Sequence, residues 1–146
     1  MARTTDLVGA ITANSYMLLI IAMFIARILG RLEIGRWIGI VSSFVLIPII
    51  CLFVVAFKTD RHIIYFIWLT LMILFVLFEL IVDDILRVDF RNTQWAVIPY
   101  VMFFFAATGG MIGLASQAGK QWSIITSVIF LIMAVLAFVQ RAITGL

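Results

Sequence analysis

The residues whose types could carry chemistry gather near the middle of the chain, in the stretch FELIVDDILRVDFRNTQW from Phe78 to Trp95. This stretch follows a run from Ile63 to Phe78 that carries no charge. Its charged residues are Glu79, Asp83, Asp84, Arg87, Asp89 and Arg91. Carboxylates beside a membrane serve two chemistries: they bind protons or cations along a path, or they hold Mg²⁺ for a diphosphate substrate.

The magnesium interpretation is the weaker of the two. Asp83 and Asp84 are adjacent in the sequence, so on a helix their side chains point in different directions. The chain has no second Asp-rich segment to complete a cage around Mg²⁺, and His62 is its only histidine. It also lacks the motifs GxSxG and HExxH and a Walker loop. We therefore expect no catalytic residue, no metal site and no cofactor.

The composition indicates an integral membrane protein. Hydrophobic residues make up 66% of the chain and charged residues 12%, against about 45–50% and about 25% in soluble domains. A chain of 146 residues cannot bury that much apolar surface in water, because small domains keep a large surface for their volume. The basic residues stand near the ends of apolar segments rather than in one run. The expected surroundings are therefore a lipid bilayer, and the net charge of +3 does not predict a nucleic-acid partner.

Five apolar segments reach or approach the length of about 20 residues that a membrane-spanning helix needs. We expect helices over about residues 7–29, 37–57, 62–86, 95–116 and 121–141. The segments are continuously apolar, whereas the strands of a transmembrane barrel alternate apolar and polar residues. The sequence therefore predicts an all-α fold: one transmembrane domain, residues 1–146, that is a bundle of five transmembrane helices with short loops.

The lysines and arginines of the expected loops predict an orientation. One side of the membrane would hold six of them, Arg27, Arg31, Arg36, Arg87, Arg91 and Arg141. The other side would hold four, Arg3, Lys58, Arg61 and Lys120. The side richer in basic residues is the cytoplasmic one. We expect the inner membrane of a prokaryote, with the N-terminus outside and the C-terminus in the cytoplasm.

Glu79 is the one carboxylate for which the membrane thickness predicts a position inside a span. From His62 to Phe78 the apolar length is only about 24 Å, less than the roughly 30 Å of a bilayer core. A helix that continues to Val82 makes up the difference and places Glu79 about one turn below the surface. Intramembrane carboxylates commonly mark proton or cation paths. The alternative is a tilted helix or a thinned bilayer that leaves Glu79 at the head groups.

The charges after Glu79 are explained by topology. On a helix, Asp83 and Arg87 are four residues apart and form a pair, and Asp84 competes for the same arginine. Asp89 and Arg91 are too close together for a helical pair and mark a turn before the next span. We therefore interpret the residues from Asp83 to Arg91 as a charge cluster at the cytoplasmic interface.

Polar residues inside the spans extend the list of candidates. Asn14 lies about one-third of the way along the first span, and its amide needs a partner on another helix. Thr108 lies in the fourth span, where a threonine can also satisfy its own helix backbone. Together with Glu79, these residues are the candidates for an ion or solute pathway, although helix packing is the simpler role for Asn14.

Small residues and a proline predict how the helices pack and bend. Gly109 and Gly113 form a GxxxG pair in the fourth span, and Gly110 adds a second row of small residues. Such rows let two helices approach closely, either within the chain or in a dimer. Pro48 lies near the middle of the second span, where it removes a backbone hydrogen bond and predicts a kink.

Three hypotheses for function stay open at this point. The leading one is a small membrane protein without enzymatic activity, of the channel or transporter type, for an ion or small solute. The second is a subunit or scaffold of a larger membrane complex, which docks through its arginine-rich face. The third is a membrane-embedded enzyme that acts on a lipid. Besides the bilayer, the expected partners are a second copy of the chain or a partner membrane subunit.

Overall fold

A computed structural model describes residues 2–60, 62–81 and 94–144. Over these residues the chain is helical apart from short turns and contains no strand, which confirms the all-α prediction. The elements are α1 (Ala2–Ile28), α2 (Leu32–Ser42), the 3₁₀ turn η1 (Ser43–Val45), α3 (Leu46–Lys58), α4 (Ile63–Glu79), α5 (Gln94–Ser116) and α6 (Lys120–Thr144).

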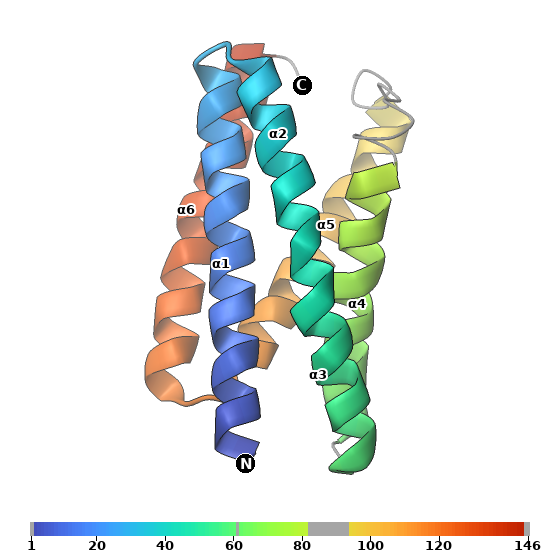
Figure 1. Cartoon of the computed structure of the whole chain (residues 1–146). Helices are drawn as coiled ribbons and strands as arrows, with labels where there is room; N and C mark the ends of the chain where they lie inside the picture. The colour runs from blue at the N-terminus through green and yellow to red at the C-terminus, as the bar shows by residue number, and fades with distance from the viewer. Residues whose placement is uncertain (1, 61, 82–93, 145–146) are drawn as a thin grey trace.

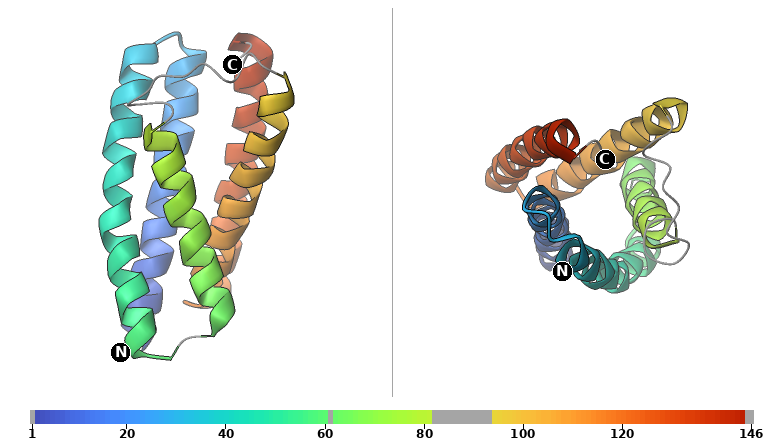
Figure 2. Two further views of the ribbon diagram at one scale, coloured as in Figure 1. Left: turned by 90° about the vertical axis from the view of Figure 1, so that its right-hand side faces the viewer. Right: turned by 90° about the horizontal axis from the view of Figure 1, so that it is seen from above.

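The helices run up and down alongside one another, and the two ends of the chain lie at opposite ends of the bundle (Figure 1). Helix α1 packs against α2, α3, α5 and α6, while α4 packs against α3 and α5. Viewed from above, α6, α1, the α2–α3 rod and α4 follow one another around the bundle, and α5 crosses it obliquely (Figure 2). The short connections enforce this antiparallel order.

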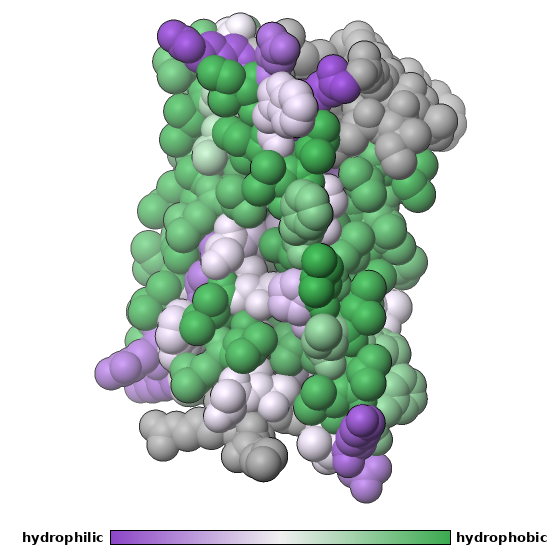
Figure 3. Space-filling model, viewed as in Figure 1, coloured by the Kyte–Doolittle hydropathy of each residue, from purple (hydrophilic) through white to green (hydrophobic). Residues whose placement is uncertain are grey.

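Four segments are long and apolar enough to cross a membrane among the residues described: Thr4–Ile28, Glu33–Lys58, Ile98–Ser116 and Lys120–Ile143. The face shown in Figure 3 is apolar over most of its length, with hydrophilic residues gathered towards its two ends. Large apolar side chains stay exposed along the helices, as Leu131 and Phe138 of α6 do. Exposure of so many apolar side chains to water would be unfavourable, whereas contact with the apolar tails of lipids is favourable. These helices are therefore suited to a membrane.

Helix α4 is shorter than the expected third span. Its 17 α-helical residues end at Glu79, which at 1.5 Å per residue spans only about 26 Å. Leu80 and Ile81 continue it as a wider π-type turn. The expected continuation to residue 86 falls among residues 82–93, outside the described part of the chain. A fifth membrane span at α4 stays a prediction.

The second span is one rod made of two α-helices. The 3₁₀ turn Ser43–Val45 joins α2 to α3 one turn before Pro48, whose ring nitrogen cannot donate to the carbonyl of Phe44. The hydroxyls of Ser42 and Ser43 donate to the carbonyls of Gly39 and Ile40, at 2.6 Å each. The 3₁₀ turn thus winds the backbone more tightly just before the proline, while the serine hydroxyls bond to carbonyls one turn earlier on α2.

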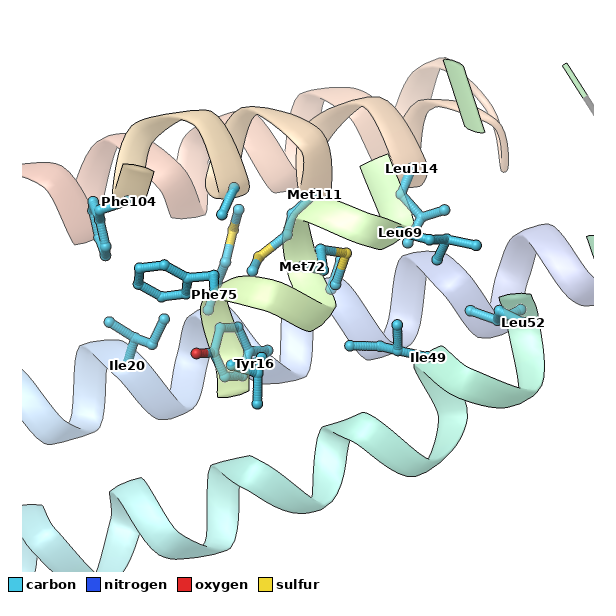
Figure 4. Close-up of a cluster of buried hydrophobic side chains, with 14 of the residues drawn as sticks. Tyr16, Ile20, Ile49, Leu52, Leu69, Met72, Phe75, Phe104, Met111 and Leu114 are labelled. Carbon is cyan, nitrogen blue, oxygen red and sulfur yellow. The ribbon is translucent and has the colours of Figure 1, made fainter. Parts of the chain in front are cut away.

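The core runs along the inside of the bundle between α1, α3, α4 and α5 (Figure 4). Its fully buried members include Tyr16 and Met17 of α1, Ile49 of α3, Leu69, Met72 and Phe75 of α4, and Met111 and Leu114 of α5. Helix α6 adds Met133. Because lipid is as apolar as these side chains, the core stabilises the bundle through close packing rather than through exclusion from water.

Candidate functional site

Glu79 and Tyr100 form a hydrogen bond between two neighbouring helices. Glu79 is the last α-helical residue of α4, and its Oε1 accepts a hydrogen bond from the hydroxyl of Tyr100 in the second turn of α5. Both side chains are half-buried. A carboxyl group that accepts a hydrogen bond from a phenol on another helix has a defined position. The pair is the candidate functional site.

Aromatic rings hold Tyr100 in place. The rings of Phe75 and Phe78, one turn apart on α4, lie 6.2 and 6.0 Å from the ring of Tyr100. Phe103 packs edge-on against Phe75 at 5.4 Å, and Phe104 lies 5.6 Å from the same ring. We call Phe75, Phe78, Tyr100, Phe103 and Phe104 the aromatic cluster. Phe75 and Phe78 of this cluster place apolar rings beside the phenol of Tyr100. An apolar environment of this kind strengthens the hydrogen bond between Tyr100 and Glu79.

Tyr100 was not among the residues singled out in the sequence. Glu79 precedes the expected connection Asp83–Gln94 by four residues, and Tyr100 follows it by six. In an antiparallel helix pair, residues at similar distances from the connection lie at similar depths. This matching depth is the signal that would have pointed from Glu79 to Tyr100.

Asn14 lies between α1 and α6. Its side chain is 7% exposed, and its Nδ2 donates to the carbonyl of Ala10 at 2.7 Å. Its Oδ1 accepts a hydrogen bond from the hydroxyl of Thr126 in α6 at 3.0 Å. Thr108 donates to the carbonyls of Phe104 and Phe105 within α5. The hydrogen bonds of Glu79, Asn14 and Thr108 thus lie at separate places in the bundle.

The bond between Asn14 and Thr126 is expected to couple α1 to α6. In a double-mutant cycle with Asn14→Ala and Thr126→Val, we expect a coupling of about 0.6–1.7 kcal/mol, the range found for hydrogen bonds between membrane helices. The cycle is measured by unfolding in mixed detergent micelles. Thr70→Val on the exposed side of α4 is the control: its effect should add to that of Asn14→Ala within about 0.5 kcal/mol. Equal coupling in both cycles would contradict the pairing.

The three glycines of α5 differ in their surroundings. A Cβ on Gly113 would overlap Cε2 of Trp68 in α4 and lie 2.6 Å from Cζ2. A Cβ on Gly110 would lie 3.5 Å from the Cα of Trp68, an ordinary contact. Around Gly109 nothing described lies within 4 Å of such an atom. Gly110 and Gly113 therefore face α4, whereas Gly109 faces outward.

A cavity of about 90 Å³ lies between α1, α5 and α6. Its lining is mostly apolar, with polar side chains from the ends of α1 and α6: Phe24, Arg27, Tyr100, Val101, Phe104, Phe105, Ala137, Phe138, Gln140 and Arg141. It lies towards the end of the bundle that carries Arg27, Arg31, Arg36 and Arg141, which we call the arginine-bearing end. Tyr100 therefore belongs to the cavity wall and also binds Glu79.

The remaining charge cluster, Asp83, Asp84, Arg87, Asp89 and Arg91, lies outside the described residues. Among the residues that are described, no group of three or more His, Cys, Asp or Glu side chains could hold a metal ion.

Comparisons with protein-family models, with curated proteins and with solved structures found no match.

Proposed function

We propose that this chain is a membrane protein without enzymatic activity, of the transporter type, that binds a proton or a small cation at Glu79. The hydrogen bond between Glu79 and Tyr100 is the observation that carries the proposal. A carboxylate at the end of an apolar helix is costly unless it has a partner, and such residues commonly belong to ion paths. Tyr100 contributes a neutral phenol, which orients the carboxyl group of Glu79 without adding a positive charge of its own.

The packed core favours a carrier over an open channel. Side chains of α1, α4 and α5 fill the bundle beyond the site, and Tyr16, Met72 and Met111 are at most 2% exposed. A continuous water path along these residues would need helices to move apart. In a carrier the site is open to one side at a time, and the helices rock around it. The 3₁₀ turn Ser43–Val45 is a natural bending point in such a movement.

Flux into liposomes tests the proposal. Purified protein is reconstituted, a potential is set with K⁺ and valinomycin, and entry of protons or Na⁺ is followed with indicator dyes. We expect flux above that of protein-free liposomes and a loss of at least about tenfold in Glu79→Gln, because a charge-assisted contact is worth that much. Tyr100→Phe, which keeps the ring and loses the donor, should reduce flux by a smaller factor.

Glu33→Gln is the matched control for this experiment. Glu33 is an exposed carboxylate in the first turn of α2, at the same end of the bundle as Glu79. Its replacement removes one negative charge at that end and leaves the Glu79–Tyr100 bond intact. Flux should stay within about twofold of wild type, a change below 0.5 kcal/mol. If Glu79→Gln conducts like wild type, or if wild type conducts no more than empty liposomes, the transport function is refuted.

A further inference from the structure

The cavity between α1, α5 and α6 combines an apolar wall with basic groups at one end. Phe24 of α1, Phe104 and Phe105 of α5 and Phe138 of α6 contribute aromatic rings to the wall. Arg27 lies in the last turn of α1, and Arg141 lies in the last turn of α6. We propose that this cavity binds an anionic glycerophospholipid, with an acyl chain along the phenylalanines and the phosphate at Arg27 and Arg141.

The size and the lining of the cavity suit part of an acyl chain. A volume of about 90 Å³ corresponds to about six to nine water-sized sites. Along the phenylalanine part of the wall, phenyl rings offer none of the two to four polar partners that a water molecule needs. In a membrane the available apolar filler is a lipid tail. Phe138 in the lining is 64% exposed, so a lipid tail can reach the cavity from the bilayer.

The charges select the head group. Arg27 and Arg141 come from two different helices to the lining of one cavity, and arginine binds phosphate through two parallel hydrogen bonds. Gln140, which is 3% exposed, and Tyr100 add neutral polar groups to the same lining. Among the described residues that line the cavity there is no carboxylate, and Glu79 contacts the hydroxyl of Tyr100 from α4. Basic sites between membrane helices at the head-group level commonly hold anionic lipids.

The size of the cavity is tested with variants that fill it. Protein in a neutral detergent is mixed with palmitoyl-oleoyl phosphatidylglycerol, and bound lipid is counted by native mass spectrometry. Ala137→Leu in α6 and Val101→Phe in α5 each place added volume in the lining, so each should lower phosphatidylglycerol binding by about tenfold or more. Ala142→Leu, at an exposed position of α6, is the matched control and should bind like wild type. Two variants from different helices keep this test decisive if one of them does not fold.

The charge selection is tested in the same assay. The double variant Arg27→Gln with Arg141→Gln should lose at least about tenfold in affinity for phosphatidylglycerol. The control Arg31→Gln with Arg36→Gln removes the same charge from the same end, outside the cavity lining, and should change binding by less than about threefold. Phosphatidylcholine with the same acyl chains should bind at least about tenfold more weakly than phosphatidylglycerol to wild type.

Each alternative has a distinct result that overturns the proposal. Equal binding of phosphatidylcholine would mean that the cavity accepts an acyl chain without reading the head group. Equal losses in the two arginine pairs would mean that the charge of the whole end attracts lipid. Unchanged binding in Ala137→Leu and Val101→Phe, or a second copy of the chain bound in place of lipid, would place the lipid elsewhere. None of these variants alters Glu79, so the outcome is independent of the flux experiment.

Discussion

Gly113→Ala is expected to lower the free energy of unfolding by about 1–3 kcal/mol, the usual cost of an overpacked interior. The reason is the contact between α5 and α4. A methyl group on Gly113 would overlap the indole of Trp68, with Cζ2 at 2.6 Å and Cδ2 at 2.9 Å. The indole is a rigid double ring, so either the ring must turn or the helices must separate. Titration with a denaturing detergent in mixed micelles, followed by tryptophan fluorescence, measures the change.

Gly109→Ala provides the comparison within the same helix. A methyl group there meets nothing within 4 Å among the described residues, and alanine favours the helix by about 0.8–1.0 kcal/mol over glycine. We expect Gly109→Ala to be neutral or slightly stabilising. If Gly113→Ala is as stable as Gly109→Ala, the close approach of α5 to Trp68 is wrong. If Gly109→Ala is the destabilising one, the outward face of α5 is itself a contact surface.

Phe75→Ala is expected to destabilise the bundle by about 2 kcal/mol or more. Phe75 is 1% exposed and lies at the centre of the aromatic cluster, with Tyr100, Phe103 and Phe104 around its ring. In a water-soluble protein such a change costs about 3–5 kcal/mol, of which part is transfer of the ring from water. In a membrane the separated helix exposes the ring to lipid, so mainly the packing and cavity contributions remain. The same detergent titration measures the effect.

Leu74→Ala is the control for Phe75→Ala. Leu74 is the preceding residue of α4 and is 51% exposed, so its side chain faces outward. Its replacement should change stability by less than about 0.5 kcal/mol, as is usual for surface positions. Similar losses for the two variants would mean that α4 is rotated about its axis from the orientation described here. Such a rotation would also remove the basis for pairing Glu79 with Tyr100.

The aromatic cluster links stability to the proposed site. Phe75 and Phe78 contact the ring of Tyr100 on α4's side of the interface, and Tyr100 donates to Glu79. A variant that loosens the cluster should therefore move the donor away from the carboxylate as well as weaken the bundle. In the flux experiment the hydrogen bond is therefore tested with Tyr100→Phe, because this variant keeps the ring in the aromatic cluster and removes only the hydroxyl.

The position of Glu79 shows how far reasoning from the sequence reaches. Membrane thickness and the length of the apolar run left two positions open for this carboxylate: inside the span, where it needs a partner, or at the head groups. The partner itself, Tyr100, is 21 positions away and is joined to Glu79 by no motif. The packing of α4 on α5 brings the two together. The same holds for Asn14, whose need for a partner was predicted and whose partner, Thr126, was not.

The glycines of α5 show the same division. The spacing of Gly109, Gly110 and Gly113 predicted a close approach between helices, since small residues three or four apart share a face. Spacing says nothing about which row faces the neighbour. In the structure Trp68 lies over Gly110 and Gly113, whereas Gly109 meets nothing. Trp68 thus lies against one glycine of each row, Gly113 of the first and Gly110 of the second, and only the rotation of α5 decides which glycines these are.

The sequence by itself determined the solvent and the class of this protein. Its apolar runs are too long and too continuous for a water-soluble fold, and a backbone in lipid must satisfy its own hydrogen bonds, which a helix does within one segment. The tertiary structure decided which side chains meet: Glu79 with Tyr100, Asn14 with Thr126, and Gly113 with Trp68. It also places Arg27 and Arg141 in the lining of one cavity. The physical reason is that helix formation is local, whereas the pairing of helix faces depends on packing between residues far apart in the chain.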